Sequence, residues 1–523
     1  MRKVSTKMHD RRRLHGRAIA LAGLLIGLGG SLRSQTPLLW GDLTAGRFAV
    51  GFRSVSVRDD SRVFRPEKRA DGSPVPGDRS RPVQISYWYP SLAPKRGGRM
   101  NFGAYVALIA REENSGNPKG SEESVGKKLF ELSLERWLGE PPSDPHTVEL
   151  MKTETAAAMD ATPAQGTYPL VLLAQGSSQS AVTHAILCEY LASHGFIVVT
   201  VPSIGPMSRE MPSEARGAEA QARDLEFALS KLRAMHVAAR VGPGVIGFSF
   251  GGFAALIESM RNPDVRVCIS LDSNLGFQGA AGFLATCPDY AAARMRVPFL
   301  HFSQSDYPGL DEKLIDSLRY SDRTIIRVKG LTHFDFSSLG MISTMIPGLV
   351  KTTRPGQREG YESVCRYVLA FLEKHMENSA TAGEDFPPGQ RGLLTIRHEG
   401  AEPAAPLYEE FVDYIRMKGV GGARKLYESV KRSSPRDTLC AEGTLNRMGY
   451  ELLYAYRLKK EAIEVFRWNV EAYPGSFNVY DSLGEAYLAD GARDSAITNY
   501  RRSLELNPQN SNARTVLERL GVK

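Results

Sequence analysis

The stretch that decides the fold is GVIGFSFGG, Gly244 to Gly252, in which a serine stands between glycines two residues away on either side. β-Branched residues precede it and the apolar run FAAL follows, so we expect a buried strand that enters a helix through a tight turn. In a G-x-S-x-G turn the glycines relieve crowding, and the serine sits on a strained backbone with its hydroxyl exposed. Ser249 is therefore a candidate nucleophile; the alternative is a small residue in an ordinary turn.

Short apolar segments alternate with helical segments on both sides of this turn. The segments include PLVLLAQG, AILCEYLASHG and FIVVTVP before it, and VRVCISLDSN, VPFLHFSQSD, TIIRVKGLTHF and YESVCRYVLAFLEKHM after it. This alternation predicts a mostly parallel sheet with helices on both faces, preceded by antiparallel strands within residues 48–90. The predicted α/β domain spans residues 35–376. An insertion at 95–165 contains one amphipathic helix, which either covers the site as a lid or packs against the domain.

The N-terminus differs from the rest of the chain in charge. The formal net charge is +8, but residues 1–34 contain eight lysine and arginine residues against the single acidic Asp10. The remainder is close to neutral, which argues against a nucleic-acid partner. A basic start, an apolar run from Ala18 to Leu28 and small residues near Ser34 indicate a signal peptide over residues 1–34. We expect an exported protein, periplasmic or extracellular, with no stable membrane span after cleavage.

The C-terminal part has a different, repetitive pattern. Residues 377–391 are polar and rich in proline and glycine, which indicates a linker. In residues 392–523 the spacing of Tyr480, Leu483, Gly484, Tyr487, Ala496, Tyr500 and Pro508 matches a 34-residue tetratricopeptide unit. Ala462 and Pro474 precede Ala496 and Pro508 by one such period. The pattern predicts an all-helical tetratricopeptide-like domain that could bind a protein partner.

A serine nucleophile needs a base, and the base needs an acid that fixes its tautomer. In hydrolases with this elbow the chain order is serine, acid, histidine. His333, in GLTHFDF after the last expected strand of the parallel run, is the candidate base. Of the other downstream histidines, we interpret His301 and His375 as structural, and His398 lies past the linker. Asp272 and Asp306 each end a strand at the same edge of the sheet, and both remain candidates for the acid.

Several motifs together resemble a known family. LASHGFIVVTVP, GFSFGG, ISLDSN, VPFLHFSQSD and GLTHFDF occur in this order. Over residues 45–375 the sequence resembles the α/β-hydrolases of the platelet-activating-factor acetylhydrolase group and their dienelactone-hydrolase-like relatives. The resemblance implies that Asp272 is the acid and His333 the base, with Asp306 as the alternative acid.

An oxyanion hole requires two backbone N–H groups, and one is expected from Phe250, the residue after the nucleophile. The resemblance implies that the second comes from Ser177, in the loop AQGSS. Gln175 stands where the family usually has histidine, so we expect substrate contacts near it to differ from those of the family.

The sequence does not indicate a cofactor or a metal. Its five cysteines form no C-x-x-C pair, and no glycine-rich loop has the setting of a phosphate-binding site. We expect a serine esterase that cleaves a small-molecule or lipid-like carboxylic ester, with short or oxidised acyl chains implied by the resemblance. The alternatives are a catalytically idle hydrolase fold that serves as an interaction scaffold, and a peptidase or acyltransferase that uses the same residues.

Overall fold

The computed structural model describes residues 37–64, 79–93, 98–112, 121–139, 141–235, 242–288, 290–350, 353–376, 392–433 and 437–522. The expected signal peptide (1–34) and the expected linker (377–391) lie outside these residues.

In the described part of the chain, ten strands form one sheet in the order β10-β9-β8-β7-β6-β4-β5-β2-β1-β3. Their bounds are β1 Ala49–Val63, β2 Ser80–Ser91, β3 Ala157–Met159, β4 Leu170–Ala174, β5 Ile197–Val201, β6 Gly244–Phe248, β7 Val267–Leu271, β8 Phe299–Gln304, β9 Arg323–Val328 and β10 Leu394–Glu399. The six central strands, β5, β4, β6, β7, β8 and β9, are parallel to one another. β2 is antiparallel to β1 and β5, as expected for the N-terminal strands, and β10 is antiparallel to β9.

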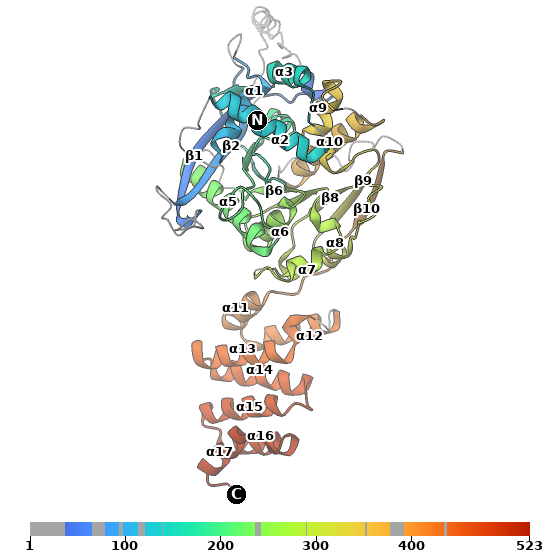
Figure 1. The fold of residues 1–523 in the computed structure, drawn as a ribbon. Helices are drawn as coiled ribbons and strands as arrows, with labels where there is room; N and C mark the ends of the chain where they lie inside the picture. Colours follow the sequence, from blue (N-terminus) through green and yellow to red (C-terminus); the bar gives the residue numbers. More distant parts are fainter. Residues whose placement is uncertain are drawn as a thin grey trace, which may run out of the picture.

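Helices cover both faces of this sheet (Figure 1). The first face packs against α1 (Phe102–Leu108), α4 (Ala185–Ser193), α9 (Leu339–Met345) and α10 (Gln357–Met376). The second face packs against α5 (Ala215–Ala234), α6 (Gly251–Arg261), α7 (Ala280–Leu284) and α8 (Lys313–Ser317). Successive side chains of a strand point to opposite faces, so in β4 Val171 and Leu173 join the first core while Leu170 and Leu172 join the second. The central strands are mostly apolar because both of their faces are buried.

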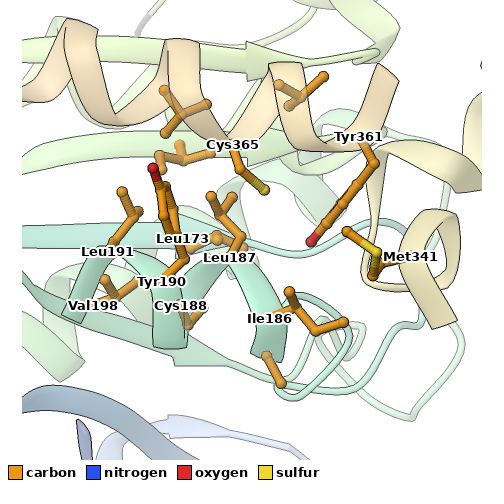
Figure 2. Close-up of a cluster of buried hydrophobic side chains, with 14 of the residues drawn as sticks. Leu173, Ile186, Leu187, Cys188, Tyr190, Leu191, Val198, Met341, Tyr361 and Cys365 are labelled. Atoms are coloured by element: carbon orange, nitrogen blue, oxygen red, sulfur yellow. The ribbon is translucent and has the colours of Figure 1, made fainter. Parts of the chain in front are cut away.

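Figure 2 shows the first core where α4 meets α10. Leu187 and Leu191 of α4, Leu173 of β4 and the α10 residues Tyr361 and Cys365 all belong to this core, and all five are buried. Burial of each large aliphatic side chain stabilises the fold by about 1.5–3 kcal/mol. All five cysteines of the chain are buried and free.

The insertion between β2 and β4 adds α1, α2 (Glu122–Leu138), α3 (Asp144–Lys152) and the short strand β3. A buried hydrogen-bond chain ties α1 to the domain: the Trp88 indole donates to the Tyr105 hydroxyl (2.7 Å), which donates to Glu189 of α4 (2.7 Å). Burial raises the pKa of Glu189. The insertion is therefore packed into the first core rather than attached at its ends alone.

The C-terminal part begins with a strand that the sequence analysis did not predict. β10 extends the sheet beyond β9, although residues 392–523 were expected to be helical throughout. No residue of β10 is fully buried and three of its six residues are exposed, so it lacks the apolar run that marks the central strands. The helical part starts at Tyr408, sixteen residues after the expected boundary of 392.

Seven helices then form a stack: α11 Tyr408–Lys418, α12 Val420–Ser433, α13 Glu442–Tyr450, α14 Lys459–Ala472, α15 Phe477–Asp490, α16 Arg493–Leu506 and α17 Ser511–Arg519. The repeat alanines Ala462 and Ala496 are both fully buried, as expected where helices cross closely. The sheet and its two helical layers are called the hydrolase-like part below. Figure 1 shows the stack extending from the end of this part that is opposite to α1 and α3. Arg296 joins the two parts by donating to the Ala405 carbonyl (2.6 Å) and to Glu410 (3.2 Å).

The observed architecture is an α/β-hydrolase fold, with a mostly parallel sheet between two helical layers, followed by an all-helical region. This confirms the fold class predicted from the sequence. Among the described helices, none combines the length and the hydropathy that crossing a membrane would require.

Candidate active site

Ser249 occupies the sharp turn between β6 and α6. Its φ of 53° lies in the left-handed region, which is strained for a residue with a side chain. The flanking glycines are required by close backbone contacts, because a methyl group on Gly251 would lie 2.4 Å from the Ala174 carbonyl oxygen and one on Gly247 would lie 2.5 Å from the Gly251 carbonyl oxygen. The geometry is that of a nucleophile elbow, which presents the serine hydroxyl at the carboxyl edge of the sheet.

His333 connects Ser249 to an acidic residue. Its Nε2 atom lies 2.8 Å from Ser249 Oγ, and its Nδ1 atom lies 2.7 Å from Asp272 Oδ2. An ionised carboxylate can only accept, so Nδ1–H donates to Asp272 and the Nε2 of the neutral ring is left to accept the Ser249 hydroxyl hydrogen. The His333 side chain is 26 % exposed, whereas the Asp272 side chain is fully buried. The structure thus brings together Ser249, His333 and Asp272.

Asp272 follows β7 in a second strained position, with a φ of 40°. Two hydrogen bonds from Gln304, at the end of the neighbouring strand β8, hold its carboxylate: one from the backbone N–H and one from the side-chain amide, each 2.9 Å long. The alternative acid, Asp306, lies two residues beyond β8 and is exposed. Sequence reasoning missed Gln304, whose signal was its place at the last position of a strand beside the acid-bearing strand.

A polar clamp fixes the short 3-10 helix that begins at His333. Asp335 is buried and accepts hydrogen bonds from the Thr332 backbone (2.6 Å) and the Gln357 side chain (2.8 Å), and it also pairs with Arg354. Gln357 and Arg354 lie at or just before the start of α10, so the clamp anchors the loop to a helix of the first core. Hydrogen bonds of Thr332, before His333, and of Asp335, after it, therefore fix the backbone that carries the imidazole.

The backbone segments that carry the two expected oxyanion donors both lie near Ser249. Phe250 is the residue before the first turn of α6, so its N–H is at the N-terminus of that helix, where the peptide dipoles favour negative charge. The loop after β4 also approaches Ser249, because a methyl group on Gly176 would lie 3.1 Å from Ser249 Cβ. Ser177 follows Gly176 and is exposed, and Ser178 is strained with a φ of 57°.

Gln175 has a structural position instead of a place beside substrate. Its side chain is fully buried, donates to the Ala181 carbonyl (3.1 Å) and lies 2.6 Å from His184 Nδ1. Gln175 thus supports the loop after β4 from the interior of the fold.

A buried glutamate from the insertion supports the same loop. Glu112 accepts hydrogen bonds from the Ser180 hydroxyl (2.5 Å) and the Ala181 N–H (3.0 Å), and it pairs with Arg209 (3.0 Å). Burial raises the pKa of this carboxyl group, and these partners oppose the shift. The insertion therefore holds the backbone that carries the second expected oxyanion donor.

The remaining histidines of the fold have structural surroundings. His184 and His301 are fully buried, and burial lowers their pKa to about 3 and about 4. His301 bonds to Ser270 (2.8 Å), His375 ends α10, and His398 bonds to Thr324 across the β9–β10 pair (3.0 Å). In the described part of the chain, no group of three or more histidine, cysteine, aspartate or glutamate residues could hold a metal ion.

Comparisons with known proteins assign no family to this chain. No family model matches the sequence, and no curated protein matches it. Among solved structures the chain is similar to a ferulic acid esterase from Streptomyces cinnamoneus, with 21 % sequence identity and a TM-score of 0.48 over 68 % of this chain and 98 % of that one. The fold assignment rests on the strand order and the helical layers of the structure itself.

Proposed function

We propose that this protein is a serine hydrolase that cleaves carboxylic esters through an acyl-enzyme intermediate. The observation that carries the proposal is the continuous hydrogen-bond chain from Ser249 Oγ through His333 to Asp272, with Ser249 on a strained elbow. These three side chains have the mutual geometry of a nucleophile, a general base and an orienting acid.

The chemistry follows from the roles that the geometry allows. Ser249 Oγ attacks the ester carbonyl while His333 Nε2 accepts its proton, and Asp272 stabilises the imidazolium that forms. The N–H groups of Phe250 and Ser177 stabilise the oxyanion of the tetrahedral intermediate. His333 then donates its proton to the leaving alcohol oxygen as the carbon–oxygen bond breaks. Water, activated by the same imidazole, releases the carboxylic acid and regenerates Ser249.

The proposed substrate class, the proposed export and the proposed role of the helical stack are supported by sequence motifs. Their resemblance to the platelet-activating-factor acetylhydrolase group supports a small or lipid-like ester with a short or oxidised acyl chain as substrate. The N-terminal pattern supports export to the periplasm or the extracellular space, and the helical stack, with its 34-residue period, supports a tetratricopeptide-type protein-interaction region.

Hydrolysis of p-nitrophenyl acetate by the full chain tests the proposal. We expect Ser249→Ala to lower kcat by about 10⁴-fold or more, because the nucleophile is lost. Ser363→Ala is the matched control, since it removes a buried serine hydroxyl that bonds only to a carbonyl of its own helix (2.7 Å). Equal rates for Ser249→Ala and the unchanged protein would support the idle scaffold instead. A peptidase or an acyltransferase would show the same serine dependence with an amide substrate or an added acceptor alcohol.

A further inference from the structure

Partly exposed aromatic rings surround the imidazole of His333. Phe334 meets it edge to face at 5.3 Å between ring centroids, and Phe277 lies 6.0 Å away. Trp137 stacks on Phe334 (5.5 Å, 17° between the ring planes), and Tyr307 lies 5.0 Å from Phe277. Trp137 comes from the insertion helix α2, Phe277 and Tyr307 come from the loops after β7 and β8, and Phe334 follows the base. Four separate segments thus contribute one ring each.

These rings are not needed to fill the cores of the fold. The fully buried face of the imidazole is already covered by Phe248, which stacks on it at 5.0 Å and is completely inaccessible. Tyr307, in contrast, is 44 % exposed, and Trp137, Phe277 and Phe334 are partly exposed. Aromatic surface that stays accessible beside reacting atoms is typical of a ligand-binding surface.

The direction of proton transfer identifies which half of an ester meets these rings. His333 must donate its proton to the leaving oxygen, so that oxygen comes within about 3 Å of Nε2. The group attached to the leaving oxygen then lies beside the neighbours of His333, at the distances of 4.5–7 Å between centroids at which aromatic rings stack or meet edge to face. The acyl group, in contrast, lies toward Ser249 and the oxyanion donors.

We propose that the leaving alcohol of the natural substrate is aromatic, and that Trp137, Phe334, Phe277 and Tyr307 form its binding surface. This inference rests on the proposed ester hydrolysis and specifies its substrate class. It also gives the insertion a function: α2 supplies one of the four rings, Trp137, to the leaving-group side. Helix α2 is then a specificity element in addition to a packing helix.

Two acetate esters with leaving alcohols of similar acidity, phenyl acetate and hexafluoroisopropyl acetate, test the proposal in the full chain. Because the acyl group is shared, the ratio of their kcat/KM values isolates recognition of the leaving group. We expect the unchanged protein to prefer phenyl acetate. Trp137→Ala is expected to reduce this preference by roughly tenfold, the amount typical of one aromatic contact, and Trp137→Phe to restore most of it.

A matched control and a second variant complete the test. Leu132→Ala removes an exposed apolar side chain (51 %) from the same helix and should leave the ratio unchanged. Tyr307→Ala changes an exposed side chain and should reduce the ratio even if Trp137→Ala fails to fold. An unchanged ratio in both variants, or an equal loss for both esters, overturns the proposed leaving-group surface while leaving Ser249-dependent hydrolysis intact. Absence of Ser249-dependent hydrolysis of either ester refutes the proposed function first.

Discussion

The carboxyl edge of the sheet and the C-terminal helical stack are built in opposite ways. At the edge, Ser249 and His333 are 84 residues apart in sequence, and Asp272 and His333 are 61 apart, yet each pair is within hydrogen-bond distance. In the stack, each helix packs mainly on helices that are adjacent in sequence, as α15 does on α16. The edge depends on the whole sheet, whereas the stack is assembled from local units.

Backbone strain shows the same contrast. The described residues include five non-glycine residues with positive φ, and three of them, Ser178, Ser249 and Asp272, lie at the carboxyl edge. The stack contains one, Arg457, in the turn before α14. Each such residue costs on the order of 1–3 kcal/mol and persists only where its surroundings enforce it. Strain concentrated at one edge of the fold is therefore evidence that chemistry takes place there, and the stack has no comparable concentration.

The largest effect is expected from a substitution that disrupts the triad of Ser249, His333 and Asp272 without changing the shape of its acid. Asp272→Asn should lower kcat by about 10⁴-fold, because an amide in place of the carboxylate favours the wrong tautomer of His333. Asp306→Asn, at the exposed neighbouring position, should change kcat by less than about twofold, in the range usual for surface substitutions. Ester hydrolysis by the two variants decides between the acids; a greater loss for Asp306→Asn would contradict the assignment.

Acid should destabilise the hydrolase-like part more than the stack. Burial lowers the pKa of His301 to about 4, from an ordinary value of 6.5, so the folded state binds fewer protons than the unfolded state between these pH values. The stability associated with neutral His301 is complete above pH 6.5 and is lost as the pH falls toward 4. This amounts to about 3 kcal/mol at about 1.4 kcal/mol per pKa unit. The stack contains no histidine, since the last one in the sequence is His398.

Urea unfolding at pH 7.5 and pH 4.5 measures this difference. In a Trp468→Phe variant the remaining three tryptophans report only on the hydrolase-like part, because Trp468 is the one tryptophan of the stack. His301→Gln should reduce the pH dependence of the fluorescence transition, and the contribution of the buried His184 should remain. An identical pH dependence with and without the histidine would show that His301 does not contribute to it.

A smaller loss is expected when the support of the loop after β4 is removed. Glu112→Ala leaves the Ala181 N–H without the Glu112 carboxylate and removes the ion pair between Glu112 and Arg209, so the backbone around Ser177 should lose its fixed position. We expect kcat/KM to fall by roughly 10-fold to 100-fold, with most of the loss in kcat. Glu122→Ala, which removes a carboxylate paired with Arg111 at the surface, is the control. Equal activity in both variants would show that Glu112 of the insertion does not support this loop.

The smallest effect on activity should come from the stack. Ala496→Leu adds volume at a fully buried helix crossing and should destabilise the stack by about 1–3 kcal/mol. Hydrolysis of p-nitrophenyl acetate should stay unchanged, because the site lies at the other end of the hydrolase-like part, beside the insertion. Thermal unfolding and the ester assay, measured on the same preparation, check both statements, and a parallel loss of activity would show that the two regions are coupled.

The sequence predicted those parts of the molecule that depend on local pattern. Apolar strands mark the central sheet, and the strand-end positions of Ser249, Asp272 and His333 place them at one edge, since the carboxyl ends of parallel strands meet there. The choice between Asp272 and Asp306 was open from the residues alone, because both positions follow a strand.

The features that the sequence did not predict depend on contacts between distant segments. The two bonds from Gln304 to Asp272 join neighbouring strands, and the stacking of Trp137 on Phe334 joins the insertion to the loop after β9. The sequence did not predict β10 because an edge strand with half of its side chains exposed lacks a buried strand's apolar run. The buried position of Gln175 depends on a histidine nine residues away whose side chain turns inward.

Covalent labelling of the intact chain with a fluorophosphonate tests the central claim most directly, since this reagent captures a serine that an adjacent base has activated. If Ser249 is the activated nucleophile, a single adduct forms on the peptide that contains Ser249. We expect this adduct to form rapidly in the unchanged protein, slowly in His333→Ala and not at all in Ser249→Ala. An unlabelled protein, or an adduct on another serine that persists in Ser249→Ala, would contradict it.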